Sequence, residues 1–514
     1  MAIQPGGAPL SIVSGLREFA GATPDATAVI DGDRRLTFAQ ADDRASRLGR
    51  HLQSLGLTVG DRVAALIGNR LEYPEVAAGI AKAGLVMVPL NPRLTAPEAG
   101  FILEHSGATA LVLDDALAPI VAAHVATTDL PCLSLVTAGS TATLGTSYDE
   151  ALAAADDRDP GIVVGERDPF CIAYTSGTTG RPKGVVISHR SRALTFMMSS
   201  LEWGLGSGRV SAAVAPMYHG AGFAFGYAPV HTGGTVSMLR GWDPAAFLDL
   251  VERDRVQSAF LVPTHAQGLR ALGDEAFESR DLSSLDTLYF NAAALPWALK
   301  QWVMERFPQC GVHELYGSTE SGIITNLRPV HMRERPGSVG HPWYLTEVRV
   351  VDGEGKEVAP GEPGELFSRS PFLMNGYLDD DEATAACTTD DGFVTCGDIA
   401  VRDEDGFISI VDRLKDLIIS GGTNVYPREV EEVLASHPDV AECAVVGEAD
   451  EQWGETVVAH VVLRDGATFD PELLDQHCRT ALAGYKLPRR WYAVPPLPRN
   501  AGGKVLKREL TAPR

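Results

Sequence analysis

The stretch Tyr174-Thr-Ser-Gly-Thr-Thr-Gly-Arg-Pro-Lys-Gly184 combines hydroxyl side chains, glycines and cations within a few residues. It directly follows residues 170–174, which have the composition of a buried strand. Gly177 and Gly180 allow the backbone to turn tightly and bring N–H groups close to an anion, and Lys183 can donate to phosphate oxygens. The stretch is not a Walker P-loop, because that motif has Ser or Thr after its Lys. A flexible surface loop has a similar composition, so the stretch alone leaves both interpretations open.

Helix and strand patterns alternate on both sides of this stretch. Thr37 followed by Gln40 forms a capping box and predicts a helix that continues to about Leu55. A second helix is expected at residues 72–83. Strands are expected at residues 63–67, 86–89, 110–113, 211–215, 259–262 and 287–290. Strands that alternate with long helices indicate βαβ units and a mainly parallel sheet.

The sequence changes in character after about residue 335. Short strands between Asp and Gly turns are expected at residues 347–351, 364–367 and 406–411. They indicate an antiparallel β region. Pro427 then begins a helix, and strands are expected at residues 441–446 and 457–462. We therefore predict an α/β fold with two domains: residues 1–412, built from βαβ-type parallel sheets plus a small β region, and residues 413–514, a small α+β domain.

The composition is that of an acidic globular protein. The 514 residues include 44 Lys and Arg against 67 Asp and Glu, which gives a formal charge of −23. With 45% hydrophobic and 22% charged residues, the composition excludes a disordered chain, a fibrous repeat and a small disulfide scaffold. The acidic excess argues against a nucleic-acid partner, because phosphate backbones are bound by clustered Lys and Arg.

The cysteines and the N-terminus indicate a cytoplasmic protein. Seven cysteines are scattered along the chain without a CxxC pair or metal-ligand spacing, as expected for reduced thiols. The N-terminus lacks the basic and apolar regions of a secretory signal. No run approaches the ~20 apolar residues of a membrane span, so we expect no integral membrane segment.

Four further motifs follow the stretch at residues 174–184. They are Tyr316-Gly-Ser-Thr-Glu320, Gly397-Asp398, Asp412-Arg-Leu-Lys-Asp416 and Pro498-Arg-Asn-Ala-Gly-Gly-Lys504. Taken singly, an acid after a strand or a Lys on a Gly turn is usually a solvated side chain. Together and in this order, the motifs resemble those of the adenylate-forming (ANL) superfamily, which contains acyl-CoA synthetases, adenylation domains and beetle luciferases. The resemblance extends from about residue 15 to about residue 510.

The resemblance implies that ATP binds to the large N-terminal domain and that the small C-terminal domain moves about a hinge at Lys415. The implied nucleotide-binding residues are Thr175, Ser176, Gly177, Thr178, Thr179, Gly180, Ala293, Tyr316, Gly317, Thr319, Asp398 and Arg413. Mg²⁺ on the ATP phosphates is implied at Glu320 and Thr175, in keeping with the preference of Mg²⁺ for few protein carboxylates plus phosphate oxygens. Cys396 departs from the family pattern, which usually has Thr before Gly-Asp.

The resemblance also implies the catalytic side chains. Lys504 would reach the substrate carboxylate and the α-phosphate, and His219 would lie beside the same carboxylate. Lys183 and Glu320 would act at the ATP phosphates. Such groups offset the repulsion between two anions while an acyl-adenylate forms. Transfer to the thiol of coenzyme A (CoA) would follow, and the matching tunnel for its pantetheine arm consists of Gly421, Gly422 and Thr423.

Two segments bear on the acyl group. The resemblance implies an acyl pocket formed by Met217, Phe223, Gly226, Asn291 and Ala292. The aromatic residues after His219 have the alternative of packing in the core. Asn291 and Ala292 stand where the family commonly has two glycines, which favours a compact, aryl or polar-substituted acid over a long unbranched fatty acid. Neither segment contains an Arg to bind a second carboxylate, so a malonate-type diacid is not expected.

The favoured function is an ATP- and Mg²⁺-dependent carboxylate–CoA ligase. The first alternative is an adenylating enzyme that delivers the acid to a carrier protein, an amine or another nucleophile. A nucleotide-binding protein without catalysis is a further alternative, against which the C-terminal Lys504 argues. Luciferase-type oxygenation has no supporting feature. The expected partners are a small carboxylic acid, ATP and CoA, and the sequence leaves a homodimer open.

Overall fold

The computed structural model describes residues 9–136, 140–175, 182–420, 423–450, 453–499 and 505–510. The chain forms two compact units. The first comprises Met1–Pro336, Pro342–Glu347 and Ser368–Val394, and the second comprises Gly337–His341, Val348–Phe367 and Thr395–Arg514. The domain boundary expected between residues 412 and 413 stays a prediction.

A long mixed sheet, which belongs to the first unit except for His341 in β16, has the strand order β16-β15-β14-β13-β12-β10-β11-β1-β2. The bounds are β16 (His341–Pro342), β15 (Gly322–Leu327), β14 (Gly311–Ser318), β13 (Thr287–Phe290), β12 (Ser258–Leu261), β10 (Val210–Ala213), β11 (Thr235–Met238), β1 (Thr27–Asp31) and β2 (Arg34–Thr37). The pairs from β1 through β14 are parallel, and β2 and β15 are added antiparallel. The parallel pairing confirms the βαβ pattern predicted from the sequence.

A second sheet of the same unit has the order β19-β9-β8-β4-β3-β5-β6-β7. The bounds are β19 (Gly376–Tyr377), β9 (Lys183–Ser188), β8 (Pro169–Thr175), β4 (Val86–Pro89), β3 (Arg62–Leu66), β5 (Ala108–Asp114), β6 (Cys132–Leu135) and β7 (Thr146–Ser147). Val63 and Ala65 pack in one hydrophobic cluster, whereas Ala64 and Leu66 pack in another. Helices therefore cover both faces of this sheet, as its continuous apolar strands require.

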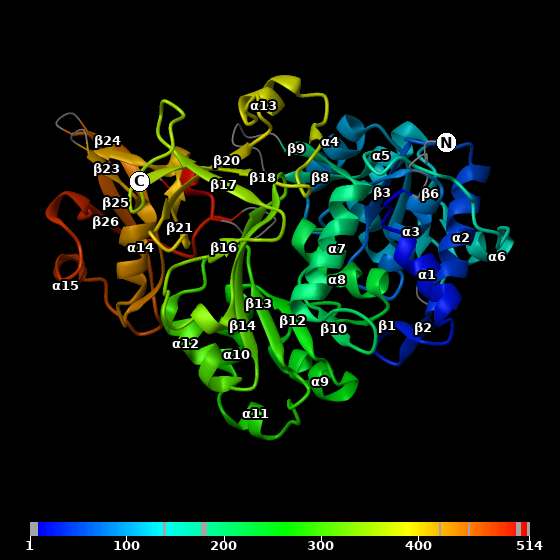
Figure 1. Ribbon diagram of the computed structural model, residues 1–514, viewed down its shortest axis with the longest axis horizontal. Helices are drawn as coiled ribbons and strands as arrows, with labels where there is room; N and C mark the ends of the chain where they lie inside the picture. Colours follow the sequence, from blue (N-terminus) through cyan, green and yellow to red (C-terminus); the bar gives the residue numbers. More distant parts are fainter. Residues whose placement is uncertain are drawn as a thin grey trace, which may run out of the picture. The chain divides into compact units, whose positions relative to one another are not determined.

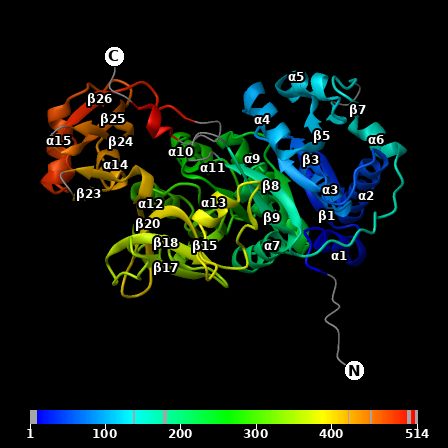
Figure 2. The same cartoon turned by 90° about the horizontal axis from the view of Figure 1, so that it is seen from above.

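The helices of the first unit fill the crossovers between these strands. They are α1 (Ser14–Ala22), α2 (Phe38–Ser54), α3 (Tyr73–Lys82), α4 (Ala96–Ser106), α5 (Ala118–Thr128), α6 (Tyr148–Ala154), α7 (His189–Trp203), α8 (Gly220–Thr232), α9 (Pro244–Asp254), α10 (Pro263–Ala271), α11 (Glu275–Glu278), α12 (Trp297–Arg306) and α13 (Asp381–Ala386). The capping box predicted at Thr37 and Gln40 is present and begins α2. In Figure 2, α2 and α3 lie on one side of β3, and α4 and α5 lie on the other. Helices α7 and α8 lie side by side (Figure 1).

The second unit consists mainly of two small sheets. One has the order β17-β18-β20-β21, with β17 (Glu347–Val351), β18 (Pro363–Arg369), β20 (Val394–Arg402) and β21 (Ile408–Arg413). The other comprises β22 (Ile418–Ser420), β23 (Thr423–Val425), β24 (Val440–Asp450), β25 (Gly454–Leu463) and β26 (Arg490–Ala493). Helices α14 (Pro427–Ala435) and α15 (Pro471–Arg479) contribute Val430, Leu434 and Leu474 to the hydrophobic cluster of the latter sheet. The mixed α/β fold with a small C-terminal β region is the fold class predicted from the sequence.

Among the described residues, no helix combines the length and the apolar character that a membrane crossing requires.

Candidate active site

Tyr377 connects two of the side chains predicted to act on ATP. Its hydroxyl donates a hydrogen bond to Glu320 Oε1 at 3.0 Å, and Lys183 Nζ lies 4.9 Å from the centre of its ring. Lys183 Nζ also lies 3.5 Å from Asp380 Oδ2. Lys183 begins β9 opposite Thr175, the last residue of β8, so Thr175 is in the neighbouring strand. The fold thus brings together a partly exposed carboxylate, a cation and a hydroxyl group at one end of β8 and β9.

The turn that presents Glu320 depends on a glycine. Residues Gly317 and Ser318 end β14 and pair with Ile323 and Gly322 of β15. A Cβ atom at Gly317 would lie 2.1 Å from the carbonyl oxygen of Gly322, closer than any side chain can approach. The close approach of these two strands therefore explains the glycine of the Tyr316–Glu320 motif. Tyr316, Gly317 and Thr319 are half-buried, and their predicted contacts to nucleotide stay predictions.

Replacing Tyr377 with Phe is expected to lower the rate of adenylation about tenfold, because Glu320 loses a hydrogen bond donated to a charged group. The measurement is pyrophosphate release at increasing Mg²⁺ concentration, in which we expect the variant to require more Mg²⁺ than the unchanged protein. An unchanged Mg²⁺ requirement would show that Tyr377 does not orient Glu320.

The loop after β13 is held by a buried ion pair. Glu314 of β14 accepts a hydrogen bond from the backbone N–H of Leu295 at 3.0 Å. Its other carboxylate oxygen lies 2.5 Å from Lys300 Nζ of α12, and the two side chains are 5% and 1% exposed. The ion pair of Glu314 and Lys300 therefore holds, through Leu295, the loop that contains the predicted site residues Asn291, Ala292 and Ala293.

Ala292 has a backbone conformation that L-residues rarely adopt. Its φ is +74°, in the left-handed region where glycine is favoured. Asn291 Oδ1 accepts the N–H of Ala292 at 2.6 Å, so the polar group expected at the pocket wall is used within the loop. Ala292 and Ala293 are exposed. The family usually has glycine at this position, and glycine adopts such a positive φ without steric strain.

The segment that carries His219 is held by Asn69. The Asn69 amide nitrogen lies 3.1, 3.1 and 3.2 Å from the carbonyl oxygens of Ala213, Ala215 and Leu239, at the ends of β10 and β11. Its Oδ1 accepts the backbone N–H of Met217 at 2.8 Å. One buried amide thus binds both parallel strand ends and the loop that leads to His219.

Tyr73 supports the same loop from the start of α3. Its buried hydroxyl donates to the carbonyl oxygen of Met217 at 3.0 Å. Asn69 and Tyr73 therefore bind the N–H and the C=O of one residue, two positions before His219. A backbone held at both groups leaves the loop little freedom to shift.

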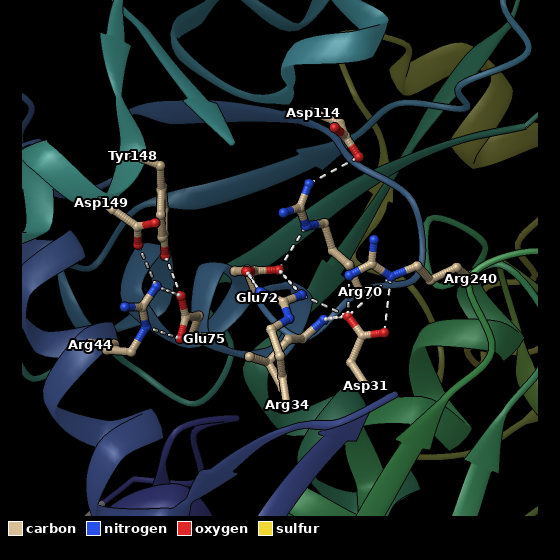
Figure 3. A network of polar contacts seen from close by, with 11 residues as sticks. Asp31, Arg34, Arg44, Arg70, Glu72, Glu75, Asp114, Tyr148, Asp149 and Arg240 are labelled. Atoms are coloured by element: carbon tan, nitrogen blue, oxygen red, sulfur yellow. Dashed lines mark hydrogen bonds and ion pairs between the residues drawn. The ribbon is translucent and has the colours of Figure 1, made fainter. Parts of the chain in front are cut away.

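Asp31 anchors the segment that connects Asn69 with Tyr73 (Figure 3). The carboxylate of Asp31 accepts the backbone N–H of Leu71 at 3.1 Å and forms ion pairs with Arg34 at 2.8 Å and Arg240 at 2.7 Å. Burial by itself would raise the pKa of Asp31, but the hydrogen bonds from Arg240 and Arg34 outweigh this effect and lower it. Asp31 is therefore ionised at neutral pH.

Glu72 extends the same network to the second sheet (Figure 3). It lies 2.6 Å from Arg34 and 2.7 Å from Arg70, and Arg70 lies 3.0 Å from Asp114 at the end of β5. The carboxylates and guanidinium groups alternate along the network, so each charge has opposite neighbours. The network joins the two sheets at the segment that carries Asn69.

His219 precedes α8 and is neutral at pH 7. Although its residue surface is exposed, nearby protein atoms displace water from the ring, and this desolvation, together with the charge of Arg93, lowers the pKa of His219. The rings of Tyr218 and His219 lie 4.5 Å apart. A neutral imidazole donates a hydrogen bond from one ring nitrogen and accepts one at the other, so His219 can donate to a carboxylate or accept from a carboxylic acid.

We expect the pKa of His219 to lie below its ordinary value of 6.5 in an NMR titration of the ring. Replacing Arg93 with Gln should raise it, because removal of a nearby cation favours the imidazolium form. His51, whose pKa is lowered by burial alone, serves as the internal control and should not change. An unaltered His219 titration in the Arg93 variant would contradict this account.

The predicted acyl-pocket residues on α8 are buried. Met217 and Gly226 are in contact, since a Cβ at Gly226 would lie 3.0–3.2 Å from the Met217 side chain. The ring of Phe223 stacks on Phe170 at 5.4 Å and on Tyr227 at 5.2 Å. Phe223 therefore contributes to an aromatic cluster of the core, and its role toward an acyl group stays a prediction.

In the second unit, Asp398 and Arg413 form an ion pair. Arg413 Nε lies 3.0 Å from Asp398 Oδ1, and the two residues pair across β20 and β21. Gly397 has a φ of +72°, and its N–H donates to Thr395 Oγ1 at 3.0 Å. The two residues predicted to bind ribose are thus neighbours, and their contact with ribose stays a prediction.

Several predicted site residues lie outside the described residues. They are Ser176, Gly177, Thr178, Thr179, Gly180, Gly421, Gly422 and Lys504. The backbone at Lys415 is described, in a short turn after β21, but not its side chain. Thr423, the remaining tunnel residue, begins β23 and is exposed.

Comparison with protein families gives two matches. Residues 16–378 match the AMP-binding enzyme family, and residues 429–504 match the C-terminal domain of AMP-binding enzymes. A feruloyl-CoA synthase from Amycolatopsis sp is 40% identical over 491 residues, which cover 95% of this chain and 96% of that protein.

Solved structures of the same fold were found with bound reactants. The o-succinylbenzoate CoA synthetase of Bacillus subtilis in complex with its acyl-adenylate intermediate has a TM-score of 0.86 and 29% identity, covering 97% of this chain and 98% of that chain. The same enzyme has been solved with ATP and magnesium ion. An amide bond synthetase from Marinactinospora thermotolerans has a TM-score of 0.86 and 29% identity, covering 97% of this chain and 99% of that chain.

Proposed function

The chain belongs to the AMP-binding enzyme family of the adenylate-forming superfamily, and we propose that it activates a carboxylic acid with ATP and transfers the acyl group to CoA. The observation that carries the proposal is the arrangement of Glu320, Tyr377 and Lys183 at the ends of β8 and β9, within the segment that matches the family. The CoA synthetases among its relatives support a thiol as acceptor.

In the first half-reaction, a carboxylate oxygen of the substrate attacks the α-phosphorus of ATP. The bond to the bridging oxygen breaks, and pyrophosphate leaves with the electron pair. Both reactants are anionic, so Lys183 and Lys504 would lower the repulsion between them. His219, held through Met217 by Asn69 and Tyr73, would donate a hydrogen bond to the carboxylate.

Glu320 and Thr175 would hold Mg²⁺. The described residues contain no cluster of three or more His, Cys, Asp or Glu side chains suited to a metal, so an all-protein cage is not found there. A single partly exposed carboxylate such as Glu320 fits Mg²⁺, which keeps phosphate oxygens and waters as its other ligands. When bound, the ion neutralises phosphate charge.

In the second half-reaction, the thiolate of CoA attacks the acyl carbonyl carbon, and AMP leaves with its phosphate oxygen. Gly421, Gly422 and Thr423 would line the path of the pantetheine arm, and Lys415 would act as the hinge between the two half-reactions. Asp398 and Arg413 would bind the ribose hydroxyl groups. An amine acceptor is the second candidate, favoured by the similarity to an amide bond synthetase.

A compact or aryl carboxylic acid is the proposed substrate class. Asn291 and Ala292 replace the glycines usual in the family, and the feruloyl-CoA synthase relative supports an aryl acid. The scattered cysteines support a cytoplasmic location. A homodimer stays a prediction.

The test is AMP and pyrophosphate production from ATP with aliphatic, aryl and amino-substituted carboxylates, each with and without CoA. Acid-dependent AMP with thioester formed only when CoA is present is the expected result. Pyrophosphate release that is indifferent to CoA would favour another acceptor, to be tested with amines. If none of the carboxylic acids causes pyrophosphate release, the proposal is overturned.

A further inference from the structure

Arg192 is a buried cation without an acidic partner in the described part of the chain. It lies in the first turn of α7 and is 7% exposed. It donates a long hydrogen bond from Nη1 to the carbonyl oxygen of Gly220 at 3.4 Å, and its Nε has no hydrogen-bond partner among the described residues. By contrast Arg190, two residues earlier, forms an ion pair with Glu166 at 2.7 Å.

The guanidinium of Arg192 lies at the N-terminal end of α8. A Cβ at Gly220, the first residue of this helix, would be 3.6 Å from Arg192 Nη2. His219 is the N-cap of α8 and makes no side-chain capping bond there. Helix N-termini favour negative charge, because their first N–H groups have no partner within the helix. The buried cation and the helix terminus therefore both favour an anion at this position.

The neighbouring side chain cannot supply that charge. Cys171 of β8 is near enough to interact electrostatically with Arg192, but burial raises the pKa of Cys171 to about 11, so it is a neutral thiol at pH 7. Arginine stays protonated in proteins, so the positive charge of Arg192 cannot be removed by losing a proton. A buried charge without a partner opposes folding, and a bound anion would remove that cost.

We infer that Arg192 binds a second acidic group of the acyl substrate, so that the preferred substrates are dicarboxylic acids. The inference rests on the proposed function, in which His219 lies beside the reacting carboxylate. One carboxylate would react near His219, and the other would form an ion pair with Arg192 next to Gly220. The absence of an Arg in the two segments around His219 and Asn291 argued against a diacid, but α7 supplies the cation from a third segment.

The experiment compares dicarboxylic acids from succinate to sebacate, and phthalate, with the monomethyl ester of each. For the best diacid, we expect kcat/KM for pyrophosphate release to exceed that of its ester by about 100-fold, as for a buried charge pair. Arg192→Met should reduce this ratio to about 1–3. Arg192→Lys should restore part of the ratio, because it keeps the charge but not the two parallel donors.

Arg190→Met is the matched control, since it removes the same charge from the same helix but from a partly exposed ion pair. It should leave the ratio of diacid to ester unchanged. The melting temperature is measured without substrate as a second readout. Arg192→Met should be at least as stable as the unchanged protein, because it removes an uncompensated buried charge.

The possible results separate the alternatives. Equal loss of activity with diacids and esters would place Arg192 at the reacting carboxylate and overturn the inference. An unchanged ratio, or a marked fall in melting temperature, would also overturn it, the latter by showing a structural role. Activity with esters but no preference for diacids would overturn this inference while supporting the proposed function, and inactivity of the folded protein with every acid would overturn both.

Discussion

Replacing Asn69 with Ala is expected to lower kcat/KM for the carboxylate by about 100-fold, the effect of a shift of about 1 Å in a catalytic loop. The amide of Asn69 binds the backbone N–H of Met217 and the carbonyl oxygens of Ala213, Ala215 and Leu239. Alanine would leave these buried groups without their partner, and each unsatisfied group costs about 1–3 kcal/mol. The loop would shift, and His219 would shift with it.

The measurement is steady-state pyrophosphate release together with chemical unfolding. We expect kcat to fall more than KM rises, because the displaced group acts on the reacting carboxylate. Tyr73→Phe is the graded comparison: it removes one hydrogen bond to the same residue, Met217, and should cost about fivefold. A loss of stability in Asn69→Ala without a change in kcat would show that Asn69 has no positioning role.

Replacing Lys300 with Met is expected to lower the free energy of unfolding by about 3–5 kcal/mol, because it leaves the carboxylate of Glu314 buried and without its counter-ion. The double variant Lys300→Met with Glu314→Leu should recover much of this loss, since replacement of both charges avoids the unpaired one. Glu314 also binds the N–H of Leu295, so part of the loss should remain in the double variant.

Urea unfolding of the single and double variants measures the coupling between the two charges. Arg306→Met is the matched control on the same helix, because Arg306 pairs with the exposed Asp274, and such a pair contributes about 0–1 kcal/mol. If Lys300→Met and Arg306→Met lose the same stability, the buried pair does not hold the loop. We further expect the KM for ATP to rise in Lys300→Met, because the loop with Ala293 loses its support.

Much of the secondary structure followed from local patterns. The capping box at Thr37 and Gln40 is formed by residues three positions apart, so no distant contact is needed to predict it. The strand before the Tyr174–Gly184 stretch and the alternation of strands with helices were predicted in the same way. The motifs that contain Glu320, Asp398 and Arg413 indicated the family. In the structure, Asp398 and Arg413 form an ion pair.

The residues that hold the candidate site could not be predicted in this way. Asn69 is separated by 148 positions from Met217, and Tyr377 by 57 from Glu320. The sequence around Asn69 contains no recognisable motif. An Asn before a helix usually caps the helix or begins a turn. Its function as a bridge between strand ends arises because the two sheets meet at this segment, joined by the network of Asp31 and Glu72.

The α/β class, the order of the elements and the chemistry of the motifs could be predicted from the chain alone, because they depend on residue periodicity and on residue types close together in the chain. The contact of Tyr377 with Glu320, the support of the His219 loop by Asn69 and the burial of Arg192 beside Gly220 became visible only in the folded protein. A buried polar group depends on its partners, and packing brings those partners from distant parts of the chain.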